Sequence, residues 1–377
     1  MRRRLFGLLL ILTSVGCIDR FWYDIYIPDT YNVAISGYIS DQPPPYEVQV
    51  IQSFDIESRQ NVRTGVSARV TLSDAEGNSE ELWQRTSGYY ETRPTGMRGR
   101  VGGVYKIRVE LNDGRVYESI PDTLMPTGRL DSIRYELVTW TSAKGISNAF
   151  DIYNQSSANP EAPDVNLMWK SRTTFKALTH PENEKGSCYY DIETGYCNFV
   201  DPCTGLKNVG TNFKPEMKRI GPCTCCICWY DDFNEKIILS DERVALNGVY
   251  PELVIDRIPI SGWYLMYKMR FETSVQSLSP QAYRFWKAVR DQYSAATNIF
   301  QPITGKIQGN LVQISGEPSQ AFGAFYSTSI ASKYLWIPRN DVREELIPSI
   351  DYPGAGEFPC YKLHPNSTTL QPVYWVD

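Results

Sequence analysis

Residues 66 to 84 read Val66-Ser67-Ala68-Arg69-Val70-Thr71-Leu72-Ser73, then Asp74-Ala75-Glu76-Gly77-Asn78, and then, after Ser79, Glu80-Glu81-Leu82-Trp83-Gln84. Apolar and polar residues alternate through the first eight positions, which is the pattern of a half-buried strand. The next five contain the Asp, Gly and Asn that tight turns favour. The sequence therefore predicts a β-hairpin here, whose second strand begins at Glu80.

The same pattern recurs on both sides of this hairpin. Further strands are predicted at Tyr31–Ile39, Tyr46–Ile51, Gly88–Tyr90, Tyr105–Leu111 and Arg115–Ser119. About seven short strands with turns roughly every ten residues are typical of an immunoglobulin-like β-sandwich. We assign this first domain to residues 31–125.

A second domain is predicted at residues 128–377, beyond a boundary at Pro121 to Gly128 that lacks periodicity. It also consists mainly of predicted strands, with a cysteine-rich insertion at residues 186–230. One helix is expected at residues 279–296, because Ser279 is a good N-cap and Pro280 suits the first helical position. The predicted fold class is therefore mainly β: a sandwich followed by a second β-rich domain with one packed α-helix.

The N-terminus has the pattern of a lipoprotein signal peptide at residues 1–17. Arg2, Arg3 and Arg4 precede an apolar run from Leu5 to Leu12, and Gly16 is followed directly by Cys17. Cys17 is thus the predicted site of lipidation, which anchors a protein to a membrane through buried methylene groups. Residues 18–30 then form an aromatic tether, or else begin the first sheet.

The composition narrows the class of function. The 377 residues carry 38 Lys and Arg against 43 Asp and Glu, a net charge of -5, so nothing favours binding to nucleic acid or anionic lipid headgroups. No second apolar run could span a bilayer, and no cofactor-binding motif occurs. We expect an exported protein that is held at the outer membrane by its lipid, and exposure on the cell surface stays open.

Eight cysteines remain when Cys17 is set aside, and an even number in an exported chain indicates disulfides. The candidates are Cys188, Cys197, Cys203, Cys223, Cys225, Cys226, Cys228 and Cys360. The pairing stays open. Cys225 and Cys226 are expected to pair elsewhere, because a bond between neighbours strains the peptide. The run at 223–228 offers a second interpretation, a thiolate metal cluster, although its spacing is not that of structural zinc sites.

An enzyme is not expected. The two histidines, His180 and His364, lie in no recognisable nucleophile context. A surface hydrolase would need two suitably placed carboxylates, and Asp231 and Asp232 beside Trp229 and Tyr230 are the candidates that we retain. A solvated turn is the simpler interpretation of this pair.

Two resemblances add to this reading. Residues Ala68–Leu72, Gly88–Tyr90 and Tyr105–Val109 follow one another as in carboxypeptidase regulatory-like, prealbumin-like sandwiches. Nearly the whole mature chain resembles a Bacteroidetes-type lipoprotein family catalogued as a domain of unknown function. That resemblance rests on the lipobox and on the segments Val33–Ile39, Gly88–Tyr90, Tyr283–Trp286, Ile307–Asn310 and Phe322–Phe325.

The second resemblance implies a context, because such lipoproteins occur beside TonB-dependent outer-membrane receptors. We therefore expect a non-catalytic accessory or binding partner of such a receptor. The alternatives are a structural or adhesive cell-surface protein and, third, a surface hydrolase. The ligand, the oligomeric state and the face of the membrane stay open.

Overall fold

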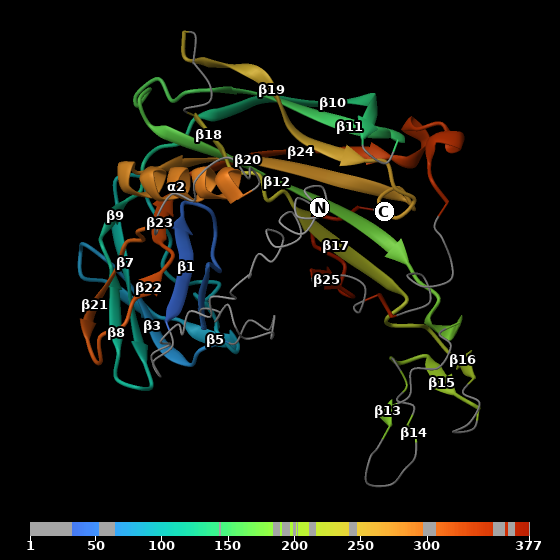
Figure 1. Cartoon of the computed structure of the whole chain (residues 1–377), viewed down its shortest axis with the longest axis horizontal. Coiled ribbons are helices and arrows are strands. Elements are labelled where there is room, and N and C mark those ends of the chain that lie inside the picture. The colour runs from blue at the N-terminus through green and yellow to red at the C-terminus, as the bar shows by residue number, and fades with distance from the viewer. Residues whose placement is uncertain are drawn as a thin grey trace, which may run out of the picture.

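The computed structural model describes residues 32–52, 65–142, 145–183, 189–190, 197–198, 201, 203–210, 216–240, 247–296, 307–349, 359–360 and 366–376. Within these ranges the chain is mainly β, with one α-helix, as the sequence predicts (Figure 1). No helix in the described part is long and apolar enough to cross a membrane. The predicted signal peptide, Cys17 and the tether at residues 18–30 lie outside the described residues.

Two sheets form the N-terminal sandwich. The first has the order β22-β1-β2-β6-β5, with β23 also paired to β1, and the second has the order β21-β8-β7-β3-β4, with β9 paired to β7. The strands are β1 Val33–Ser40, β2 Glu47–Gln52, β3 Ala68–Asp74, β4 Ser79–Glu81, β5 Trp83–Thr86, β6 Tyr89–Glu91, β7 Val104–Leu111, β8 Val116–Ser119 and β9 Asp122–Thr123. Alternate residues of β7 are buried, so one face of that strand builds the core.

The predicted hairpin is present, but its second strand is divided. β3 pairs antiparallel with β4 across the turn, with Thr71 opposite Glu81, and Gly77 adopts φ +90°. After β4 the chain crosses to the other sheet as β5, where Trp83 lies opposite Glu91. Leu82 lies at the crossing and is buried in the core. Burial of this single side chain between the sheets explains why Glu80–Gln84 is not one strand.

Three strands from late in the sequence complete the sandwich: β21 Leu311–Ser315, β22 Ala321–Phe322 and β23 Phe325–Thr328. β21 pairs with β8, while β22 and β23 run parallel to β1. The backbones cross closely here, because a Cβ on Gly309 would lie 1.9 Å from the Gly323 carbonyl oxygen. The side chain of Asn310 then both donates to and accepts from the backbone of Phe325. These contacts explain the Gly-Asn and Phe-Gly pairs as packing residues.

The second unit stacks two sheets. A three-stranded sheet, β10-β11-β19, lies over a larger one ordered β24-β20-β12-β17-β25, with β18 paired to β12 (Figure 1). The strands are β10 Arg129–Ser142, β11 Gly145–Ser157, β12 Asn166–Leu178, β17 Ile227–Phe233, β18 Ile238–Leu239, β19 Val249–Pro259, β20 Lys268–Leu278, β24 Ile330–Pro338 and β25 Ser367–Thr368. Trp169 is fully buried between the layers, with its indole N–H donated to Ser156.

The helix α2 spans Pro280–Ala296 and confirms the predicted capping. The Ser279 hydroxyl accepts a hydrogen bond from the Ala282 N–H at 3.1 Å, as an N-cap does. Ala282, Tyr283 and Trp286 pack against Tyr326 and the larger sheet. Short 3-10 helices occur at Pro181–Asn183, Arg339–Asp341 and Glu344–Leu346.

A seam of buried polar groups joins the sandwich to the second unit. β23 ends at Thr328 and β24 begins at Ile330, so one stretch of chain passes from one unit into the other. At this crossing Asp41 accepts from Ser329 and from the Ile330 N–H. Asp122 accepts from Ser279 and from the Ser327 N–H. Because each carboxylate accepts a hydrogen bond from the second unit, Asp41 from Ile330 and Asp122 from Ser279, the two units are coupled at this seam.

Burial raises the pKa of Asp122 above its ordinary 3.8, although its hydrogen bonds to Ser279 and Ser327 oppose the shift. Its protonated form stabilises the fold below pH 3.8, and that contribution is lost as the pH rises through the folded-state pKa. We therefore expect Asp122→Asn, which cannot titrate, to gain stability relative to wild type as the pH rises from about 4 to about 7. Urea unfolding of both proteins across this range checks the sign, and a constant difference would contradict it.

The cysteine-rich insertion projects from the ends of β12 and β17, away from the sandwich (Figure 1). Its short strands are β13 Tyr189–Tyr190, β14 Cys197–Asn198, β15 Leu206–Asn208 and β16 Met217–Arg219, paired as two antiparallel hairpins. Gly205 precedes β15 at φ +91°, and a Cβ there would lie 2.0 Å from the Pro222 carbonyl oxygen. The chain returns to β17 through this close crossing.

Candidate functional site

The two faces of the larger sheet of the second unit differ in chemical character. Side chains alternate along β12, so Trp169 and Phe175 point to the core while Lys170, Arg172 and Lys176 point to the opposite side. The core side carries the apolar packing and the opposite side carries cations. We call the second side the cation–aromatic face.

The antiparallel register brings like-facing residues of the neighbouring strands beside these cations. On β20, Glu272 lies opposite Arg172, and Arg270 lies opposite both Thr174 and Trp336. On β17, Asp231 lies opposite Thr174. The face as we define it consists of Lys170, Arg172, Thr174, Lys176, Trp229, Asp231, Lys268, Arg270, Glu272, Tyr334 and Trp336.

A charged network occupies the centre of the face. Arg172 donates to Glu272 at 2.9 Å and lies 3.7 Å from Asp231, and Arg270 pairs with the same Glu272 carboxylate. Burial acts to raise the pKa of Glu272, but Arg270 and Arg172 outweigh burial and hold it below its ordinary value. Glu272 is therefore ionised and keeps two partly buried guanidinium groups in place.

Aromatic rings lie against nearly every cation of this face. Arg270 lies over the ring of Tyr334 at 4.3 Å, and Lys268 lies over Trp336 at 4.7 Å. Lys176 is 5.6 Å from the ring of Trp229. Such cation–π contacts strengthen as water is removed from them. The face thus combines flat rings with fixed positive charge.

The face also differs in charge from the protein as a whole. Lys170 lies against Trp286 of α2, and burial lowers the pKa of its ammonium, so it adds little charge to the open part of the face. The other cations of the face, Arg172, Lys176, Lys268 and Arg270, exceed its two carboxylates, Asp231 and Glu272, by two. The whole chain has a net charge of -5. This contrast favours binding of a neutral or acidic group at the face.

The C-terminal segment, residues 366–376, crosses the face, and we call it the strap. β25 pairs with Trp229 and Tyr230 of β17. The ring of Tyr374 lies 4.5 Å from the Arg270 guanidinium and 5.1 Å from that of Arg172. Burial raises the pKa of Tyr374, so its hydroxyl stays protonated.

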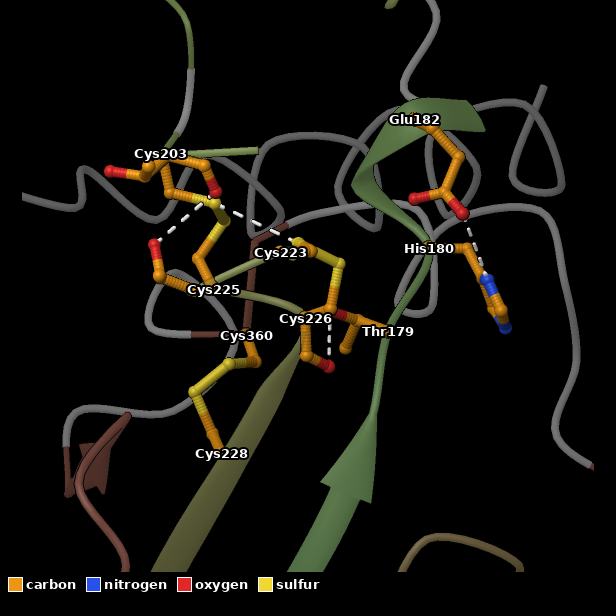
Figure 2. The surroundings of a disulfide bond; sticks show 11 residues. Thr179, His180, Glu182, Cys203, Cys223, Cys225, Cys226, Cys228 and Cys360 are labelled. Atoms are coloured by element: carbon orange, nitrogen blue, oxygen red, sulfur yellow. Dashed lines mark hydrogen bonds and ion pairs between the residues drawn. A yellow bond between two sulfur atoms is a disulfide. The ribbon is translucent and has the colours of Figure 1, made fainter. Parts of the chain in front are cut away.

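Six of the predicted disulfide cysteines pair at one end of the face (Figure 2). The bonds join Cys203 to Cys225, Cys223 to Cys226, and Cys228 to Cys360. The adjacent Cys225 and Cys226 thus pair elsewhere, as expected. Cys188 and the side chain of Cys197 lie outside the described residues.

The alternative of a metal cluster has a geometric basis, because the sulfurs of Cys203, Cys223 and Cys225 all lie within 4.8 Å of one another. In the structure these atoms are engaged in disulfides. These disulfides lie where the insertion joins the sheet. A backbone hydrogen bond adds to them there, because the Thr179 N–H after β12 donates to the Cys226 carbonyl at 2.7 Å (Figure 2). The Cys228–Cys360 bond attaches the chain just before the strap.

The carboxylates Asp231 and Asp232 do not form a pair. As neighbours on a strand they point to opposite faces. Asp231 accepts from Thr174 at 2.5 Å on the cation–aromatic face, whereas Asp232 accepts from Tyr264 on the core side. These two groups therefore cannot flank one scissile bond.

Asp232 instead lines a polar pocket of about 290 Å³ with Asp256 and Glu235. Burial raises the pKa of Asp256, which accepts from the Ser171 hydroxyl at 2.9 Å. The Tyr264 hydroxyl also has a raised pKa, first through burial and then through Asp232. Asp232, Asp256 and Tyr264 each have a partner within the protein, which fits a structural role.

Of the two histidines, His180 lies 3.3 Å from Glu182 next to the disulfides, and His364 lies outside the described residues (Figure 2). The cation–aromatic face was not predicted from the sequence. The alternation of Lys170, Arg172 and Lys176 along one strand is the signal that could have indicated it.

Comparison with known proteins identifies the family. No curated protein matches the chain. A family model described as a domain of unknown function, DUF4249, matches residues 21–334. This range contains the sandwich, most of the cation–aromatic face and the cysteine-rich insertion, while Cys360 and the strap follow it. Because the match extends over far more than half of its 377 residues, the chain belongs to the DUF4249 family.

Proposed function

We propose that this protein is a lipid-anchored, non-catalytic binding protein of a bacterial outer membrane and works beside a TonB-dependent receptor. The signal pattern that ends at Cys17 supports the anchor. The resemblance to Bacteroidetes-type lipoproteins encoded beside such receptors supports the partner. The prealbumin-like character of the sandwich also belongs to this proposal, and modules of that kind are usually non-catalytic.

The observation that carries the binding function is the cation–aromatic face. Tyr, Trp and Arg are enriched at protein interfaces and account for much of their binding energy. Tyr334 is 58% exposed beside Arg270, and Tyr267 is 43% exposed beside Lys176. These residues lie on neighbouring strands of one sheet, which fixes their positions relative to one another and so reduces the ordering cost of binding.

The test is a mild-detergent pull-down of the tagged protein from its own outer membranes. We expect a TonB-dependent receptor in stoichiometric amount, and we expect Tyr334→Ala to reduce its recovery severalfold by removing an exposed interface ring. Tyr293→Ala is the matched control, because Tyr293 is 57% exposed but lies on α2. Cys17→Ala is expected to move the protein out of the membrane fraction.

Recovery of the protein alone would overturn the receptor proposal. Equal recovery of receptor with Tyr334→Ala and Tyr293→Ala would retain the receptor but place its contact elsewhere on the protein. The pull-down therefore tests the receptor as partner and Tyr334 as the contact separately.

A structural or adhesive role is the second candidate, because the edge strand β21 exposes Val312 and Ile314 at 53% and 52%. β21 stands at the end of its sheet, and exposed apolar edges favour pairing with other chains. Self-association that Val312→Lys abolishes would favour this role.

A further inference from the structure

We infer that the cation–aromatic face recognises a peptide segment with two adjacent aromatic side chains at a turn, and that the strap occupies this site in the free protein. The inference deepens the proposed binding function, on which it rests, by naming the class of ligand. It is argued from how the chain's own Tyr374 and Trp375 bind.

The first subsite holds the ring of Tyr374. The guanidinium groups of Arg172 and Arg270 lie against this ring, and both arginines are fixed from the other side by Glu272. The Tyr374 hydroxyl lies 3.3 Å from Thr174 and 3.4 Å from Asp231. The subsite therefore has a cationic wall for a ring and a polar end for its hydroxyl.

The second subsite holds the indole of Trp375, which is 3% exposed. The rings of Trp336 and Trp229 meet it edge-on at 5.1 and 6.5 Å, and the Lys268 ammonium lies 6.0 Å away. Edge-to-face packing of this kind is favourable beyond the apolar area that it buries. Two neighbouring aromatic residues at one turn of the strap thus fill two adjacent subsites.

The strap is built to leave the face more readily than a core strand. Two of its hydrogen bonds close turns within the strap: the Trp375 N–H donates to the Pro372 carbonyl, and Gln371 donates to the Trp375 carbonyl. β25 contributes only a two-residue ladder. Short elements with exposed backbone open at low free energy.

The outer side of the strap is apolar and faces solvent. Leu370 is 77% exposed, Val376 is 65% exposed, and Val373 is fully exposed. The strap thus covers the rings of the face while leaving its own apolar side chains in water. A longer partner segment that filled both subsites and also paired along β17 would make more contacts than the strap does.

The tether determines how the strap competes. The Cys228–Cys360 bond joins the chain to β17 six residues before Asn366. A short tether of this kind gives the strap an effective concentration on the order of millimolar. A free peptide with the same contacts is therefore excluded from the wild-type protein unless the strap is removed.

The test uses the full-length purified protein and a synthetic peptide of residues 366–377, measured by calorimetry. We expect Tyr374→Ala/Trp375→Ala protein to bind this peptide about tenfold or more tightly than wild-type protein, because its own strap no longer competes. The matched control is the same peptide with both aromatic residues replaced by alanine, which is expected not to bind.

Carboxypeptidase trimming of the folded wild-type protein provides a second route that does not depend on the double variant folding. We expect trimming to remove Trp375 and to create binding of the peptide. Failure of both the variant and the trimmed protein to bind, or equal binding by wild type and variant, would overturn the inference. The assay contains no receptor, so its failure is distinct from failure of the pull-down.

Discussion

Glu272→Gln lowers the free energy of unfolding by about 3 kcal/mol, because it leaves two partly buried guanidinium groups without their shared carboxylate. Arg270 has a side chain only 7% exposed, and Glu272 is 24% exposed, so water replaces the lost charge poorly. Arg172 keeps only its longer, 3.7 Å contact to Asp231. Urea unfolding at neutral pH measures the loss.

Glu252→Gln is the matched control. Glu252 pairs with Arg134 on the surface of β19, where both side chains are more than a third exposed. Exposed ion pairs contribute little, so this variant is expected to unfold almost as wild type does. An equal loss in the two variants would contradict the central place that we give to Glu272. When it is added to the Tyr374→Ala/Trp375→Ala protein, Glu272→Gln is also expected to weaken binding of the strap peptide.

Cys228→Ala/Cys360→Ala lowers the free energy of unfolding by up to about 5 kcal/mol, since the bond closes a long loop of the unfolded chain. The sequence separation is 132 residues. Cys223→Ala/Cys226→Ala is the control, because its separation of 3 residues predicts a loss of only about 2 kcal/mol in the same loop-entropy model. Urea unfolding of both variants under non-reducing conditions measures which of them loses more free energy of unfolding.

A larger loss for the short loop would show that local packing of the disulfides outweighs loop entropy. The Cys228 variant tests the strap as well. Without this bond the strap has a longer tether and a lower effective concentration, so the wild-type aromatic pair competes less well with added peptide. Peptide binding equal to that of the wild-type protein would show that the Cys228–Cys360 bond does not control competition by the strap.

The sequence predicted most of the local structure in the sandwich and the helix. The alternation at Val66–Ser73 and Tyr105–Leu111 predicted β3 and β7, because a strand with one buried face has a period of two. Ser279 and Pro280 predicted the start of α2 through capping chemistry. Such signals depend only on neighbours in the chain.

These local signals do not predict how the chain is divided between the two units. Residues 311–328 form strands that pair with β1 and β8, far away in the sequence. The sequence of a single strand does not indicate which strand it pairs with, because pairing depends on long-range register and packing. The predicted bounds of 31–125 and 128–377 therefore describe the order of the chain, while the sheets combine segments from both ranges.

The residues of the candidate site are likewise brought together from distant parts of the sequence. The cysteines were visible as a cluster, but their pairing required three-dimensional distances. The cation–aromatic face takes its residues from β12, β17, β20 and β24, and no local motif joins Arg172 to Glu272. Its subsites became visible only when Tyr374 and Trp375 were found on it.

The amino-acid sequence by itself determined the β class, the capped helix and the number of cysteines, since each depends on residue type and short spacing. Only the tertiary structure decided that late strands complete the sandwich, that Asp231 and Asp232 face apart, and that the C-terminus covers a cationic sheet face. The physical reason is that sheet register, burial and charge pairing are properties of segments brought together by folding.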